Sequence, residues 1–309
     1  MVDASELEGD DLIVHSLKQT AVRAAVTLNS LGMVQTDKAA SRDIIDAKRS
    51  IAGASVVKVS RLPGADAHDK AIRAAQNRGR TALHARSMPY GDHIGWRLLP
   101  NRNLIPVMQE FGQARKEHEE AHARFMDDVA NVLAAARANL GDFDVRLPTE
   151  EEIAKAYSMK IDFEEIPDGR YEGIDQDLAR KLSKHTKERV VIAFQSGQAE
   201  VLPRILEPVA VFAERMQAFE EREMRLLAGE GGNSRTGHFR DAVVENLKPL
   251  AEALRGFNLT QNPRLETLAE RVASLAQVDP SLLRTEPAAR EKSRREAVAI
   301  METLKDWSG

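Results

Sequence analysis

The sequence has no cysteine, few aromatic residues and no long apolar run. Without cysteine there can be no disulfides, iron–sulfur clusters, thiolate zinc sites or cysteine nucleophiles. No stretch approaches the roughly 20 apolar residues that a helix needs to cross a bilayer. The chain starts with the acidic residues Asp3, Glu6, Glu8, Asp10 and Asp11, whereas a secretory signal starts with basic ones. We therefore expect a cytoplasmic protein of a bacterial host cell, with no membrane partner.

What the chain does contain fits a water-soluble globular protein. Its 309 residues are 42% hydrophobic and 30% charged, and only 5% are aromatic. The net charge of -4 is unevenly spread along the chain. Residues 38–102 hold 13 basic against 5 acidic side chains, and residues 142–177 hold 12 acidic against 4 basic. We expect opposed charged surfaces, which favour charged partners or a homo-oligomer.

Hydrophobic periodicity predicts a mainly helical chain. Apolar residues recur every three or four positions over 103–140, which indicates one long amphipathic helix. Residues 174–228 also have a helical pattern, and Gly197, Pro203 and Pro208 are expected to break or kink so long a span. Further helices are expected near 37–51, 66–85, 239–254, 263–276 and 288–306, and one is expected to start at Thr149, which with Glu152 forms a capping-box pattern.

Short strands are expected at 55–60, after the turn at 88–95, and at 157–166. Residues 11–28 fit a strand or a helix equally well. The predicted fold class is α+β, predominantly α, with long antiparallel helices and a small β-sheet in the N-terminal half. We expect one part over residues 1–170 and a helical part over 171–309, packed together as one unit.

The basic stretch contains a candidate surface for single-stranded DNA. Arginines would contact phosphates while Tyr90 and Trp96 stack on bases. In the alternative interpretation, Trp96 lies in the core and the arginines are paired or solvated. The candidate residues are Arg78, Arg80, Arg86, Tyr90, Trp96, Arg97 and Arg102.

A second candidate is the pattern His118-Glu119-Glu120-Ala121-His122, which matches H-E-x-x-H within the long helix. In zinc proteases this spacing places two imidazoles on one helix face and a glutamate beside the metal-bound water. A metal site at His118 and His122, and with it a zinc-dependent hydrolase, is the less favoured hypothesis. The metzincin continuation is broken by Phe125 and Asp128, and the charged flanks fit a solvated helix face.

Other catalytic patterns are missing from the sequence. Residues 229–232 are rich in glycine but lack the Gly-Lys-Ser/Thr ending of a P-loop, and there is no G-x-S-x-G motif. We therefore expect no cofactor and no enzymatic activity. The apolar stripe of 103–140 and the series Phe194, Val201, Phe212, Met216 and Phe219 are expected to pack against each other, with a partner interface at their ends.

Several blocks occur in a characteristic order between residues 88 and 170. They are Gly95-Trp96-Arg97-Leu98-Leu99-Pro100, Arg137-Ala138-Asn139-Leu140-Gly141, Leu147-Pro148-Thr149-Glu150-Glu151-Glu152-Ile153 and Met159-Lys160-Ile161-Asp162-Phe163-Glu164-Glu165-Ile166-Pro167-Asp168. In these blocks the chain resembles the domain of unknown function 3150 family of phages and bacteria, although Leu147 replaces the family's usual aromatic residue.

The resemblance implies partners rather than a reaction. Members of that family look like partners of a MoxR-type AAA+ ATPase and a von Willebrand factor A-type protein, and no catalytic residue carries over. The leading hypothesis is a non-catalytic phage or prophage interaction or assembly protein, which would act as an adaptor for such an ATPase. The alternative is a single-stranded DNA-binding or annealing protein.

Overall fold

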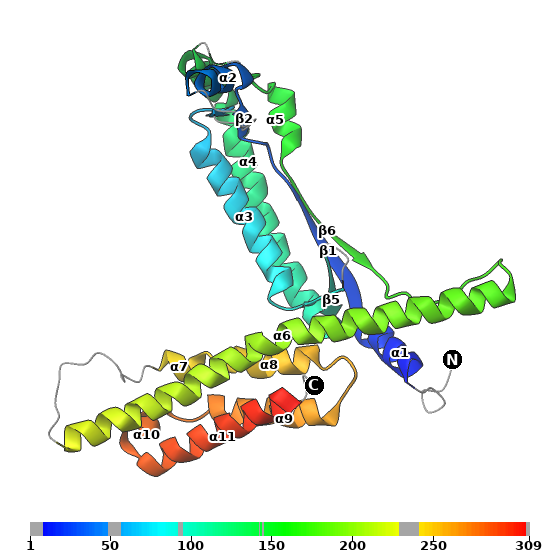
Figure 1. Ribbon diagram of the computed structural model, residues 1–309, viewed down its shortest axis with the longest axis vertical. Helices are drawn as coiled ribbons and strands as arrows, with labels where there is room; N and C mark the ends of the chain where they lie inside the picture. Colours follow the sequence, from blue (N-terminus) through cyan, green and yellow to red (C-terminus); the bar gives the residue numbers. More distant parts are fainter. Residues whose placement is uncertain are drawn as a thin grey trace. The chain divides into compact units, whose positions relative to one another are not determined.

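The structure is a computed structural model that describes residues 9–48, 57–91, 95–141, 143, 145–228 and 241–306 (Figure 1). Contacts between residues divide the chain into two compact units. Unit 1 comprises Met1–Ala24, Arg86–Leu104 and Phe163–Gly309, and unit 2 comprises Ala25–Ala85 and Ile105–Asp162. The division therefore does not follow a single cut at residue 170, and packing of the whole chain as one unit stays a prediction.

Unit 1 is built around α6, the longest helix of the described chain. Helix α6 spans Gln176–Leu227, and α11 (Pro287–Asp306) lies alongside it (Figure 1). The two helices run antiparallel, because Glu220 and Glu223 of α6 pair with Arg294 and Arg290 of α11 in reverse order. The other helices of this unit are α1 (Asp10–Thr20), α7 (Ala242–Glu245), α8 (Lys248–Phe257), α9 (Pro263–Ala276) and α10 (Pro280–Thr285).

Unit 2 contains a second antiparallel pair, α3 (Asp66–His84) and α4 (Leu104–Leu140). His68 near the start of α3 stacks on Phe125, while Gly79 near its end lies against Phe111. The unit also contains β2 (Val34–Thr36), α2 (Lys38–Ala47), β3 (Lys58–Ser60) and α5 (Glu150–Ala156). Strands β2 and β3 pair antiparallel, with Gln35 opposite Val59.

A four-stranded antiparallel sheet has the order β4-β5-β1-β6. Strands β4 (Met88–Pro89) and β5 (Trp96–Pro100) belong to unit 1, followed by the 3₁₀ turn η2 (Asn101–Asn103). Strands β1 (Ala21–Asn29) and β6 (Ser158–Glu164) each continue from one unit into the other. The predicted class, α+β and predominantly α with a small N-terminal sheet, is confirmed.

Local sequence patterns predicted the positions of several elements correctly. Thr149 and Glu152 form the expected capping box, in which each side chain accepts a hydrogen bond from the other residue's backbone N–H. The undecided stretch 11–28 contains both elements, since α1 passes directly into β1 at Ala21. The expected strand at 55–60 is seen only at β3, and residues 55–56 lie outside the described chain, as do the glycine-rich residues 229–232.

The expectation that Gly197, Pro203 and Pro208 break the long helical span was wrong. Helix α6 runs without interruption for 52 residues and includes Gly197, Pro203 and Pro208. The two apolar stripes contribute to separate cores, one in each unit, and their packing against each other stays a prediction. The stripe of α6 packs with α8, α9 and α11, whereas that of α4 packs with α3 and residues around β6. Among the residues that the structure describes, no helix combines the length and apolarity of a bilayer crossing.

Candidate functional site

The seven residues of the predicted DNA surface are divided between the units. Arg78 and Arg80 lie on α3 in unit 2, and the other five lie in unit 1. Arg78 is paired with Glu117 of α4, while Arg80 and Arg102 are exposed. Arg86 is half-buried, and its carbonyl accepts a hydrogen bond from Asn103 Nδ2 at 2.9 Å.

Arg97 is part of the core of unit 1. Its side chain is 7% exposed and donates to Ser87 Oγ at 2.7 Å and to the Ser87 carbonyl at 2.8 Å. Burial lowers the pKa of Arg97 to about 10. Its guanidinium therefore joins β5 to the residue before β4 and is not available for a phosphate.

Tyr90 and Trp96 hold an arginine of the same chain. The Arg23 guanidinium lies 5.3 Å from the centre of the Tyr90 ring and 5.2 Å from that of Trp96, and it also pairs with Glu164. Tyr90 is 3% exposed, and burial raises its pKa. These rings serve the packing of unit 1, as the alternative interpretation of Trp96 proposed.

The H-E-x-x-H pattern places its two imidazoles inward and its glutamate outward. His118 is buried, His122 is half-buried, and their nearly parallel rings are 6.3 Å apart. The Nε2 atoms of both are buried without a hydrogen-bond partner. Glu119 is exposed and paired with Arg115 at 2.9 Å. Within the described ranges, no three His, Asp or Glu side chains gather to hold a metal ion, so the zinc hypothesis has no third ligand there.

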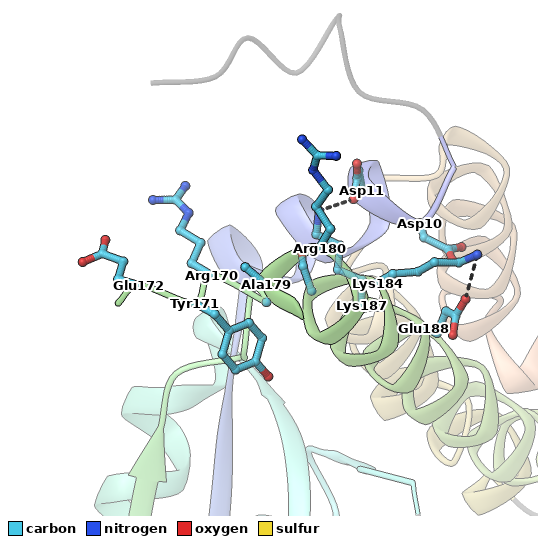
Figure 2. A pocket seen from close by; sticks show the side chains of 12 residues that line it. Asp10, Asp11, Arg170, Tyr171, Glu172, Ala179, Arg180, Lys184, Lys187 and Glu188 are labelled. Atoms are coloured by element: carbon cyan, nitrogen blue, oxygen red, sulfur yellow. Dashed lines mark ion pairs between the residues drawn. The ribbon is translucent and has the colours of Figure 1, made fainter. Parts of the chain in front are cut away.

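An open groove of about 760 Å³ lies where the start of α1, the loop 169–173 and the first turns of α6 come together in unit 1 (Figure 2). Charged side chains of both signs dominate its walls. The lining residues are Asp10, Asp11, Gly169, Arg170, Tyr171, Glu172, Ala179, Arg180, Ser183, Lys184, Lys187 and Glu188.

The acidic and basic groups of this groove are held differently. Asp11 is paired with Lys187 at 2.7 Å, and Asp168 beside the groove is paired with Lys18 at 2.6 Å. The hydrogen bond from Lys18 holds the pKa of Asp168 below its usual range. Arg170, Arg180 and Lys184 are instead 77%, 79% and 80% exposed, and their ion pairs are longer, at 3.2–3.8 Å.

The sequence contains a basic segment at this groove, but counting charges over longer stretches did not separate it from the acidic residues before it. Residues 176–189 hold five basic and two acidic side chains, but the preceding acidic stretch ends at Asp177 and overlaps them. The sequence predicts a helix from residue 174, and the fold shows that its exposed start lies beside Tyr171 and α1.

A second exposed feature is the C-terminal end of α6. Phe212 and Met216 are fully buried, whereas Met224, Leu226 and Leu227 are 63%, 54% and 87% exposed. Leu227 follows Met216 at helical spacing, so the apolar stripe continues beyond the part of the helix that the core covers.

The chain matches no protein-family model, and comparison with curated proteins and with solved structures likewise finds no match.

Proposed function

We propose that this chain is a non-catalytic interaction or assembly protein that docks a partner chain on the C-terminal end of α6. The observation that supports this is the exposure of Met224, Leu226 and Leu227 at the end of a helix whose apolar stripe is buried at Phe194, Val201, Phe212 and Met216. Covering such side chains contributes roughly 1.5–3 kcal/mol for each one fully buried. The end of α6 therefore offers a partner a favourable contact.

Neighbouring helices hold the end of α6 in place. The end of α6 therefore offers a partner chain a fixed surface. Arg290 of α11 is 1% exposed, lies 5.0 Å above the Phe219 ring and pairs with Glu223. The same guanidinium donates to the carbonyls of Leu283 and Arg284 at 3.1 and 3.0 Å, which joins α10 to α6. A preorganised surface loses less conformational entropy when a partner binds.

The partner that we propose is a MoxR-type AAA+ ATPase, so the chain would act as an adaptor or assembly subunit of a phage or prophage. This identity comes from the resemblance to the domain of unknown function 3150 family. The apolar end of α6 supplies the contact, and the charged surfaces of the chain would select the partner by complementarity.

Co-purification tests this proposal. The tagged full chain is co-expressed with a MoxR-type ATPase of the same genome, and we expect a stoichiometric complex. The double variant Leu226→Asp with Leu227→Asp should lose the ATPase because it places two charges in the contact. The matched control is Ile105→Asp, which changes a side chain that is 67% exposed on α4.

Each variant is first checked by circular dichroism for an unchanged melting temperature. Retention of the ATPase by the double variant, or its absence with the wild-type chain, would overturn the proposal. Equal loss with Ile105→Asp would do the same, because the contact would then not lie at the end of α6.

A further inference from the structure

We propose that the groove between α1, the loop 169–173 and the start of α6 binds single-stranded nucleic acid, with Arg170, Arg180 and Lys184 on the phosphates and Tyr171 against a base. This goes beyond the interaction role, since it assigns a ligand to another surface of unit 1. It also locates nucleic-acid binding at residues different from those that the basic stretch 38–102 had indicated.

The first step is that two carboxylates, one in the groove and one beside it, are already paired with lysines that are less exposed than the groove's outer cations. Asp11 is held by Lys187, which is 30% exposed, and Asp168 by Lys18, which is 38% exposed. These short pairs at 2.7 and 2.6 Å neutralise two of the carboxylates, and Asp10, Glu172 and Glu188 also line the groove. The charge at the rim of the groove then depends on the side chains that extend further into solvent.

Those outer groups include the cations Arg170, Arg180 and Lys184, together with the exposed carboxylates of Asp10 and Glu172. Arg170 and Arg180 point away from the ribbon toward the same open side in Figure 2, and Lys184 follows Arg180 by one helical turn. Their own carboxylate partners lie at 3.2–3.8 Å, and those of Arg180 and Lys184 are exposed, while Asp168 beside Arg170 is half-buried. Such surface pairs contribute about 0–1 kcal/mol, so phosphates can take the place of the carboxylates at small cost.

The second step is the aromatic ring beside these cations. Tyr171 is 41% exposed, and its hydroxyl lies 2.6 Å from Thr186 Oγ1 of α6, which fixes the ring against the helix. Gly169 and Gly173 flank the residue with φ of 72° and 77°, a conformation that other residues rarely adopt. A fixed, half-exposed ring next to phosphate-binding cations is the arrangement by which proteins bind single strands without reading their sequence.

The third step is that positive charge continues along the helix beyond the groove. Residues 176–189 of α6 contain five basic and two acidic side chains, and Lys181 is exposed. A flexible strand that leaves the groove can therefore follow the helix. A peptide carrying one phosphate would use only a small part of this surface, which is why we favour a polyanion.

Fluorescence anisotropy with a labelled oligothymidine tests the proposal on the full chain. We expect binding at low ionic strength that weakens steeply as salt is added, because phosphate contacts release counterions. The triple variant Arg170→Ala, Arg180→Ala, Lys184→Ala should lower the affinity at least tenfold. It should also reduce the slope of log affinity against log salt by about 2, since each lost contact on a single strand removes about 0.7.

Matched variants make the result specific. Arg115→Ala, Arg124→Ala, Lys155→Ala removes three exposed cations of unit 2 and should leave the affinity unchanged. Tyr171→Ala should weaken binding about tenfold, and Tyr171→Phe, which keeps the ring, should bind far better than Tyr171→Ala.

The opposite results would overturn the proposal. They are the absence of salt-dependent binding, an equal loss with the unit 2 control, or a loss that follows Arg80→Ala with Arg102→Ala instead of the groove variant. Binding to phosphatidylserine vesicles without binding to the oligonucleotide would also overturn it. The ATPase pull-down is unaffected by any of these variants if the end of α6 binds separately.

Discussion

His118 illustrates how burial of one titratable residue makes stability depend on pH. The side chain is 5% exposed, its Nε2 has no hydrogen-bond partner, and His122 stacks beside it one turn away. Burial lowers the pKa of His118, and the neighbouring His122 lowers it further, while Glu119 acts in the opposite direction. The unfolded chain therefore binds a proton at His118 more tightly than the folded chain does.

The expected result is a loss of stability in acid. The contribution of neutral His118 is fully present above the unfolded pKa of about 6.5 and decreases as the pH falls below that value toward the lower folded pKa. His118→Leu should reduce the fall in melting temperature between neutral and mildly acidic pH. His185→Leu, which changes an exposed histidine of α6, should leave that fall unchanged. Identical pH profiles for wild type and His118→Leu would contradict this interpretation.

Replacement of Arg290 should destabilise unit 1 substantially, because its guanidinium connects α10, α11 and α6. Arg290→Met would keep an apolar stem of similar length but leave the carbonyls of Leu283 and Arg284 and the carboxylate of Glu223 without their donor. We expect a loss of about 2–4 kcal/mol in the free energy of unfolding, measured by urea titration. Arg295→Met removes a 73% exposed arginine of the same helix and should change it by less than about 0.5 kcal/mol. Equal effects of the two changes would refute the role of Arg290.

Residue types alone could not assign Arg97, Tyr90 and Trp96 to a surface or a core. Aromatic and cationic residues in a basic stretch fit nucleic-acid binding and cation–π packing equally well. The distinction depends on Arg23, which lies on β1 far away in the sequence, and on Ser87, which accepts from Arg97. Contacts between distant segments of the chain are what a single sequence does not display.

At the scale of elements, Gly197 shows why residues that often break helices did not predict the length of α6. A Cβ on Gly197 would lie 2.6 Å from the carbonyl oxygen of Pro89 and 3.2 Å from Met88 Cβ. The glycine therefore allows β4 to cross close to the helix, and it does not end the helix. Pro203 and Pro208 likewise lie within continuous helix, because packing against α11 and the rest of the core of unit 1 outweighs the cost of each missing hydrogen bond.

Two Gly→Ala changes in long helices should have opposite effects. Gly197→Ala should destabilise the protein by about 1–3 kcal/mol, since backbone of β4 would have to move. Gly112→Ala on α4 has nothing within 4 Å of its Cβ and should stabilise by about 0.5–1 kcal/mol through helix propensity alone. Thermal or urea unfolding measures both. A stabilising Gly197→Ala would show that β4 does not pack closely on α6.

Helix boundaries were predictable wherever capping residues and periodicity agreed. Thr149 at the start of α5, Asn262 before α9 and the stripe of α4 are examples. The helix expected near 66–85 begins at Asp66, with Ala65 at the N-cap. The junction of α1 and β1 carried no signal, because no glycine or proline separates the helix from the strand at Ala21.

At the scale of the whole molecule, the charge pattern of the sequence is redistributed by the fold. The basic stretch 38–102 and the acidic stretch 142–177 are each divided between the two units. Some of their charges are also paired internally, as in Arg146 with Glu152. Opposed charged surfaces and a homo-oligomer therefore stay predictions, and the exposed features of unit 1 are the parts that we expect to act.

Hydrogen–deuterium exchange of the purified complex with the ATPase tests the central claim most directly, namely that the end of α6 is where this chain meets its partner. We predict slower exchange in the last turns of α6 around Met224–Leu227 when the ATPase is bound. Exchange in α4 around Ile105 should be the same in the free and bound chains. Protection that leaves the end of α6 unchanged and appears elsewhere would contradict the account.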